Sequence, residues 1–218
     1  MSLRSTARSK ASRTRRSNGW KRSRFNVPGT GRLRADRLRT LAADVICLSL
    51  AGNDHNVLGL FEHSAPFTLG DLPDDGLDRV RIPDCVMRSQ LEHRMRPVVE
   101  RTRPVHRIVA DRQIVHICPP PPDPDAAHME ADPKLFGDIV HRGVAPDPLR
   151  LRLYRLQCAI ARRLAGKSGA TFLPPPGQGC NDAGFLARDC RNDDPTHANA
   201  RYGRLVTDQL ADLEWHMQ

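Results

Sequence analysis

Short apolar runs that end at proline clusters constrain the fold of this chain more than any other sequence feature. QIVHIC at residues 113–118 is followed by PPPPDPD, and ATFL at residues 170–173 is followed by PPPGQG. Proline has no backbone N–H for a neighbouring strand, so a central strand cannot continue through it. DVICLSL at residues 44–50 is equally apolar and is followed by AGND. We predict three short strands, the first of them buried on both faces.

Helical spacing of apolar residues separates these runs. We predict helices within residues 34–43, from about residue 84 to residue 104, and within residues 148–169. The third of these helices places Leu153, Leu156, Ile160 and Leu164 on one face and has Gly166 near its end. A last helix is expected to begin at DPTH, residues 194–197, and to turn Leu205, Val206, Leu210 and Leu213 inward. Strands that alternate with helices of this length predict an α/β fold with a parallel sheet.

The carboxyl ends of the predicted strands indicate where a ligand would bind. In open parallel sheets the ligand lies beyond those ends. This rule brings GNDHN (52–56), PPPPDPD (119–125) and PPPGQGCND (174–182) to one rim of the sheet. Polar groups from distant parts of the sequence converge there, so we expect the functional site at this rim.

Charge divides the chain into two parts. Residues 1–40 contain 13 of the 34 basic residues but a single acid, Asp36, so the remainder carries a slight excess of acidic groups. Residues 1–33 show no hydrophobic period, and we predict a basic, disordered segment there, followed by one domain at residues 34–218. Either this arm is a solvated tail, or residues 1–40 bind a polyanion weakly through salt-sensitive phosphate contacts. Trp20 and Phe25 are too few for a base-stacking platform.

Several classes of protein are disfavoured by composition. No run approaches the ~18 apolar residues of a membrane span, and the N-terminal residues lack the apolar stretch of a secretory signal. The six cysteines form no C-x-x-C pair, which is typical of reduced thiols. Histidines and cysteines such as His55, His63 and Cys180 match no common zinc spacing. We therefore expect a cytoplasmic protein without a membrane span, metal site or cofactor.

An aspartate three residues before a histidine occurs three times, as Asp125/His128, Asp138/His141 and Asp194/His197. The third pair precedes the last predicted helix, and two interpretations are open. Asp194 is a favoured N-cap residue, and the proline that follows it suits the first helical position, so the pair could simply begin a helix. Alternatively, the carboxylate orients the imidazole of His197 and stabilises its protonated form.

The segment SLAGNDHN follows the first predicted strand. Gly-Asn-Asp forms generic turns, because glycine tolerates positive φ and both polar residues bond to their own backbone. The alternative is that the amide of Asn53 points over the rim and donates a hydrogen bond to an oxygen that becomes negative during a reaction. Asn181 competes for this role, since GCND follows the third strand.

LSLAGNDHN after a strand, together with the late DPTHANARYG, resembles the SGNH (GDSL-type) hydrolase family. VHICPPPP, RLYRLQ and DAGFL resemble a bacterial branch of that family, and the similarity runs from about residue 44 to residue 210. The resemblance implies a three-layer, flavodoxin-like α/β/α sandwich and cofactor-free hydrolysis of esters, thioesters or acetylated sugars. It also implies site roles: His197 is the general base, Asp194 orients it, Asn53 is the oxyanion donor, and Gly52 and Asp54 shape the loop.

The chain departs from the family at its nucleophile. The family's serine lies in a G-D-S-like turn after the first strand, and this sequence has no such turn. Ser49 and Ser64 are available hydroxyls, but neither fits the pattern, so the nucleophile stays unassigned. A missing first strand would leave the 44–50 strand with an exposed edge. We hypothesise that residues 1–35 come from a shifted reading frame or a misassigned start in a GC-rich gene.

The sequence therefore predicts two alternative functions. The first is hydrolysis of a small ester or an acetylated carbohydrate through an acyl-serine. The second is a catalytically inactive module that binds nucleic acid or another polyanion through its basic N-terminal arm.

Overall fold

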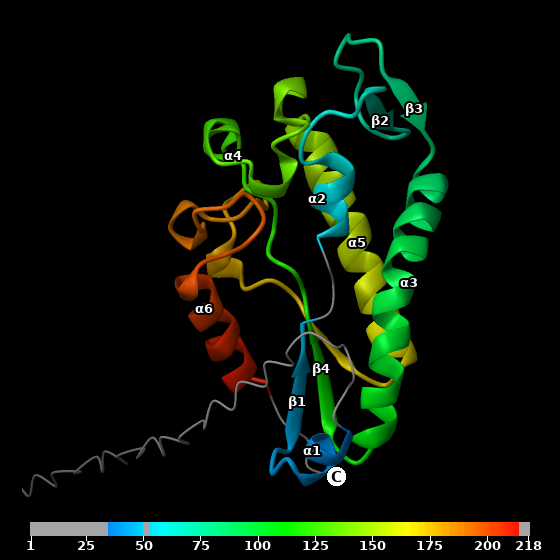
Figure 1. Cartoon of the computed structure of the whole chain (residues 1–218), viewed down its shortest axis with the longest axis vertical. Coiled ribbons are helices and arrows are strands. Elements are labelled where there is room, and N and C mark those ends of the chain that lie inside the picture. The colour runs from blue at the N-terminus through cyan, green and yellow to red at the C-terminus, as the bar shows by residue number, and fades with distance from the viewer. Residues whose placement is uncertain (1–34, 50–52, 214–218) are drawn as a thin grey trace, which may run out of the picture. The chain divides into compact units, whose positions relative to one another are not determined.

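A three-stranded parallel sheet forms the centre of the domain. The computed structural model describes residues 35–49 and 53–213. Strands β1 (Val45–Leu48), β4 (Gln113–Ile117) and β5 (Thr171–Leu173) pair in the order β1-β4-β5, so β4 is central (Figure 1). Both pairings are parallel. The three predicted strands and the α/β fold with a short parallel sheet are confirmed.

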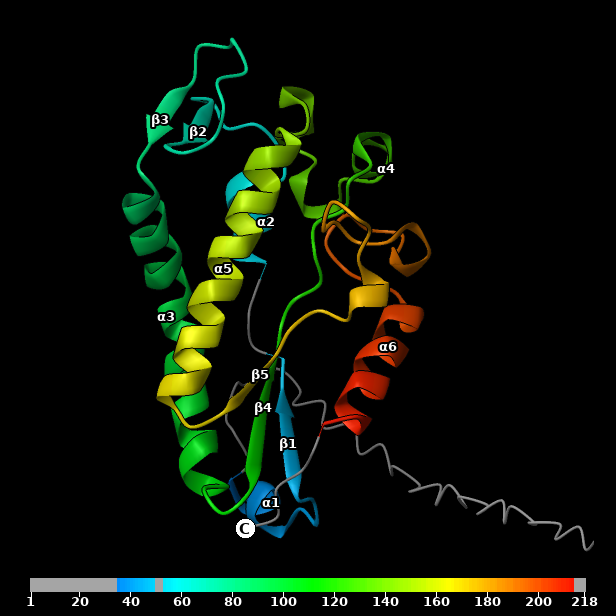
Figure 2. The ribbon, with the colours of Figure 1, turned by 180° about the vertical axis from the view of Figure 1, so that it is seen from behind.

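Helices cover both faces of this sheet (Figure 2). On one face, α3 (Asp84–Ile108) and α5 (Asp147–Lys167) pack against Ile46 and Ile114. On the other face, α6 (Ala200–Ala211) places Leu210 against Val115 and Leu173. Neighbouring residues of β4 therefore face opposite layers, as the alternation of side chains along a strand requires. The domain has three layers, α/β/α.

Strand β1 differs from the prediction in its burial. Ile46 is buried, and Val45 packs in the α6 layer, but Cys47, two residues further along that face, is exposed. The prediction that both faces of this strand are buried is therefore wrong at Cys47, which does not belong to the cluster that Leu210 of α6 forms with Val45. Within residues 35–49 and 53–213, β1 pairs on one side only, with β4.

A second, two-stranded sheet lies apart from the first and was not expected from the sequence. Strands β2 (Phe67–Leu69) and β3 (Val80–Ile82) are parallel. Phe67 and Leu69 pack into the same cluster as Leu91 of α3 and Leu153 of α5, which extends the core beyond the main sheet. Strands of three residues are too short for a periodic pattern to show in the sequence.

Helix α5 forms as its apolar spacing predicts. Leu153, Leu156 and Ile160 are almost completely buried, and each such side chain contributes roughly 1.5–3 kcal/mol through burial. The helix ends at Lys167, so Gly166 lies near its end as predicted, and Gly169, with φ +71°, follows the C-cap residue Ser168. The Ala170 N–H donates to the carbonyl of Ala165 and the Gly169 N–H to that of Gly166, a Schellman arrangement that leads directly into β5.

The remaining elements are short. They are α1 (Ala35–Thr40), α2 (Asp54–Gly59), α4 (Ala126–Ala131) and four 3₁₀ turns at Lys134–Phe136, Val140–Arg142, Gly177–Gly179 and Arg188–Cys190. Helix α3 extends four residues beyond its predicted end and contains both Pro97 and Pro104. Among the helices that the structure describes, none combines the length and apolar character of a membrane span.

Candidate active site

Segments that follow β1 and β4 meet the segment that leads into α6 at the carboxyl edge of the sheet. Together they surround an open cavity of about 600 Å³. Ser49 and Asn53 line it after β1, and Cys118 to Pro120 after β4. Residues 196–199 line it ahead of α6, and Tyr202, Gly203, Val206, Thr207 and Leu210 line it from that helix. The predicted rim is thus only partly correct. PPPGQG after β5 packs instead against the first turn of α6, where Gly179 allows the close approach of the Tyr202 ring.

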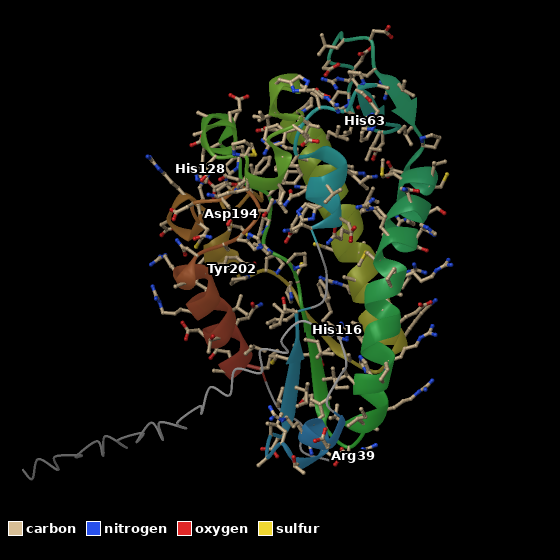
Figure 3. The ribbon with its side chains drawn as sticks, viewed as in Figure 1. Arg39, His63, His116, His128, Asp194 and Tyr202 are labelled. Carbon is tan, nitrogen blue, oxygen red and sulfur yellow. The ribbon has the colours of Figure 1, made fainter. Side chains whose placement is uncertain are left out.

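Asp194 and His197 form a hydrogen-bonded pair beside this cavity (Figure 3 labels Asp194). Asp194 Oδ1 lies 2.8 Å from His197 Nδ1, and the same oxygen accepts from the backbone N–H groups of Thr196 and His197. Partial burial opposes ionisation of Asp194, but the hydrogen bonds from Thr196 and His197 outweigh it and lower its pKa to about 2. At neutral pH the imidazole therefore faces a carboxylate.

The pair does not begin a helix. Helix α6 starts at Ala200, and Asn199 is its N-cap, since Asn199 Oδ1 accepts from the N–H groups of Arg201 and Tyr202. The predicted helix start at DPTH, with Asp194 as the cap, is therefore wrong. Asp194 closes a local turn ahead of the helix instead, and this turn holds the His197 ring on the carboxylate.

One ring nitrogen of His197 remains available. Nδ1 contacts Asp194, and Nε2 has no hydrogen-bond partner within the described part of the chain. His197 lines the cavity, and its side chain is 68% exposed. A carboxylate on Nδ1 selects the tautomer whose Nε2 lone pair can accept a proton, which is the arrangement of a general base.

Asn53 lines the same cavity as His197. It occupies the N-cap position of α2, yet its side chain makes no capping hydrogen bond. The sequence suggested a turn here, and the structure has the short helix α2 instead. Because the cap is not used, the Asn53 amide is free of the local role that its position would suggest.

Of the two residues that flank Asn53, only Asp54 belongs to the described residues. Asp54 Oδ1 accepts from Nε of Arg94 at 3.0 Å, which ties the start of α2 to α3. This contact agrees with a loop-shaping role for Asp54. Gly52 lies outside the described residues. The competing amide, Asn181, accepts with Oδ1 from the N–H groups of Ala183 and Phe185, so it stabilises its own turn.

Ser49, which the sequence offered as an available hydroxyl without the family's pattern, lines this cavity. Strand β1 ends at Leu48, so Ser49 lies just past its carboxyl end, is exposed, and lines the cavity with Asn53 and His197. A serine at the end of a strand can indicate a site residue, but the apolar run DVICLSL continues past Leu48, so the sequence did not show that the strand ends there. Ser64 lies in a different hollow, beside Glu62 and His63.

The other two Asp/His spacings have different roles. Asp125 caps α4 by accepting from the backbone of His128, while the His128 ring contacts buried Asp123 at 2.6 Å. Asp123 also pairs with Arg191, which fastens the loop after β4 to the segment that carries Asp194. Asp138 and His141 are exposed and share no hydrogen bond among the described residues.

The histidines considered as metal ligands have different surroundings. His55 is buried against Gln157, whose Oε1 accepts from the His55 backbone at 2.7 Å, and burial lowers the pKa of its ring to about 4. His63 lies near β2 and β3, away from Asp194 (Figure 3). In residues 35–49 and 53–213, no group of three histidine, cysteine or carboxylate side chains could hold a metal ion.

Comparison with known proteins adds no relatives to this description. No family model matches the chain, and no curated protein matches it significantly.

Proposed function

We propose that the cavity at the carboxyl edge of the sheet hydrolyses esters. His197 is the general base, Asp194 orients it, and Asn53 donates to the carbonyl oxygen of the substrate. The observation that carries this proposal is that one cavity is lined by Ser49, by Asn53, whose side chain makes no capping hydrogen bond, and by His197, which pairs with Asp194. The resemblance of GND and DPTH to the SGNH hydrolases supports the same roles.

Ser49 is assigned as the nucleophile, since it is the serine among the described residues that lines this cavity. His197 Nε2 takes the hydroxyl proton while the Ser49 oxygen bonds to the ester carbon. The carbonyl electrons move to oxygen, where the Asn53 amide donates a hydrogen bond. The C–O bond to the alcohol then breaks, and His197 returns the proton to the leaving alkoxide. Water releases the acid by the same steps.

The substrate class is the one that the resemblance to the SGNH hydrolases implies. The cavity is open and accommodates a small ester or an acetylated carbohydrate, and no step of this chemistry needs a cofactor. Asp194 is ionised throughout the neutral range because of its low pKa, so His197 meets an acceptor at every working pH.

A fluorophosphonate probe tests the activity and the nucleophile together. We expect labelling of the folded chain at Ser49, lost in Ser49→Ala and strongly reduced in His197→Ala. His141→Ala is the matched control, because His141 has the same spacing from an aspartate but no contact with it. Absence of labelling in a chain with native circular dichroism would end the hydrolase proposal. A label on another serine would refute only the assignment of Ser49.

The uneven charge favours a second candidate, a binding module whose residues 1–40 contact a polyanion. Affinity for an arbitrary duplex DNA should then fall steeply between 50 and 200 mM salt, by about 10³-fold or more for six phosphate contacts. Binding that does not respond to salt, or no binding, would eliminate this candidate.

A further inference from the structure

A second cavity, of about 360 Å³, lies on the other face of the sheet, between α3, α5 and β5. Its size is at the lower end of the roughly 300–1,000 Å³ of small-molecule sites. Met95 and Val99 of α3, Leu164 of α5 and Phe172 of β5 give it an apolar interior. It differs from the candidate active site in its lining residues, of which only Ile117 is common to both.

The polar lining of this cavity is entirely basic or neutral. Arg103, Arg107 and Lys167 line it together with His106 and His116, and its lining includes no carboxylate. Some cations elsewhere in the domain pair with acids, as Arg79 does with Glu62. The three cavity cations, by contrast, form no ion pair with the residues that the structure describes.

Two of these cations repel each other along α3. Arg103 and Arg107 are four residues apart on α3, a spacing at which like charges repel each other. Lys167, at the end of α5, adds a third positive charge to the same opening. A bound anion would relieve this repulsion, whereas a metal cation would increase it.

His106 and His116 form a neutral pair inside the cavity. Their Nε2 atoms are 3.0 Å apart, and their rings stack with centroids 5.2 Å apart. Burial lowers the pKa of both rings, and for His116 the neighbouring imidazole lowers it further. The pair therefore adds polar surface without a fixed charge, and the positive charge is concentrated on the two arginines and the lysine.

We propose that this cavity binds an anionic amphiphile, specifically a monomeric fatty carboxylate. The hydrocarbon chain occupies the apolar interior formed by Met95, Leu164 and Phe172. The carboxylate lies at Arg103, Arg107 and Lys167, where bidentate contacts to guanidinium groups are available. This site is separate from ester hydrolysis, so it does not depend on the proposed function.

Calorimetric titration of the full chain with decanoate, kept below its micellar concentration, tests the proposal. We expect saturable binding of one decanoate and much weaker binding of 1-decanol, which has the same chain without the charge. Arg103→Gln and Arg107→Gln should each weaken decanoate about two- to fivefold, and the triple variant with Lys167→Gln at least tenfold. Arg96→Gln is the matched control, because Arg96 is an exposed residue of α3 outside the cavity lining.

A steric variant tests the apolar half independently. Ala161→Leu places a larger side chain at the cavity wall and should abolish decanoate binding while the circular dichroism stays native. Decyl phosphate serves as the third probe, and preference for it over decanoate would refute the carboxylate assignment. Equal binding of decanol, insensitivity to the charge variants, or absence of saturable binding would overturn the proposal. His197→Ala should leave decanoate affinity unchanged, so failure of ester hydrolysis and failure of this site are distinguishable.

Discussion

Replacing Asp194 by asparagine tests the proposed chemistry with little change in structure. Asn can still accept, through Oδ1, the backbone hydrogen bonds from Thr196 and His197 that close the turn. What it loses is the negative charge 2.8 Å from His197 Nδ1. The variant therefore separates the support of the imidazole from the geometry of the loop.

The size of the effect follows from the exposure of the pair. Two unit charges about 4 Å apart interact by about 1 kcal/mol in water and about 4 kcal/mol near a protein surface. Asp194 is 16% exposed and His197 68% exposed, so the interaction lies between these limits. We expect kcat/KM to fall about 10²-fold, less than where such a pair is fully buried, with KM little changed.

The assay is hydrolysis of p-nitrophenyl acetate across pH 5–9, with folding checked by circular dichroism. Asp138→Asn is the control, since Asp138 is exposed and has the same spacing from a histidine. A loss below threefold in Asp194→Asn, with the fold intact, would refute the argument that the carboxylate orients a general base. An equal loss in Asp138→Asn would refute it as well.

Three further predictions concern stability, measured by urea unfolding. The pKa of Asp194 is lowered from 3.8 to about 2, so its ionised form stabilises the fold above pH 4. About 1 kcal/mol of this free energy of unfolding, discounted for exposure, is lost as pH falls from 4 to 2. Asp194→Asn should flatten that pH dependence. Asn199→Ala removes the N-cap of α6 and should cost about 1 kcal/mol, whereas no loss would contradict the capping geometry. Gly179→Ala brings a methyl group to 2.8 Å from the Tyr202 ring and should cost about 1–3 kcal/mol, while an unchanged midpoint would show that the ring moves freely.

The regular elements of the main sheet could be predicted because their signals are local. Proline cannot continue a strand, so PPPPDPD and PPP mark the ends of β4 and β5. The apolar spacing of Leu153, Leu156 and Ile160 marks the buried face of α5. The strands β2 and β3 and the helix α2 were missed, because their short apolar stretches are interrupted by glycine, proline and aspartate, residues that favour turns.

The sequence indicated candidate site residues but could not show which of them act together. Spacing alone placed a carboxylate near an imidazole three times and an asparagine after a strand twice. It could not show that Asn181 and Asp125 serve their own turns, or that Asn199 and not Asp194 caps α6. Each of these alternatives obeys the same local rules of capping and turn formation.

The sequence by itself determined the class of fold, because periodicity and proline stops act within a few residues. Only the tertiary structure decided which polar groups meet. Strand order and the loops after β1 and β4 bring Ser49, Asn53 and His197 to one cavity, although 148 positions separate the first from the last. The same packing gathers Arg103, Arg107 and Lys167 from two helices around the other cavity. Contacts between distant segments depend on how whole layers pack, and no local pattern of residues encodes that arrangement.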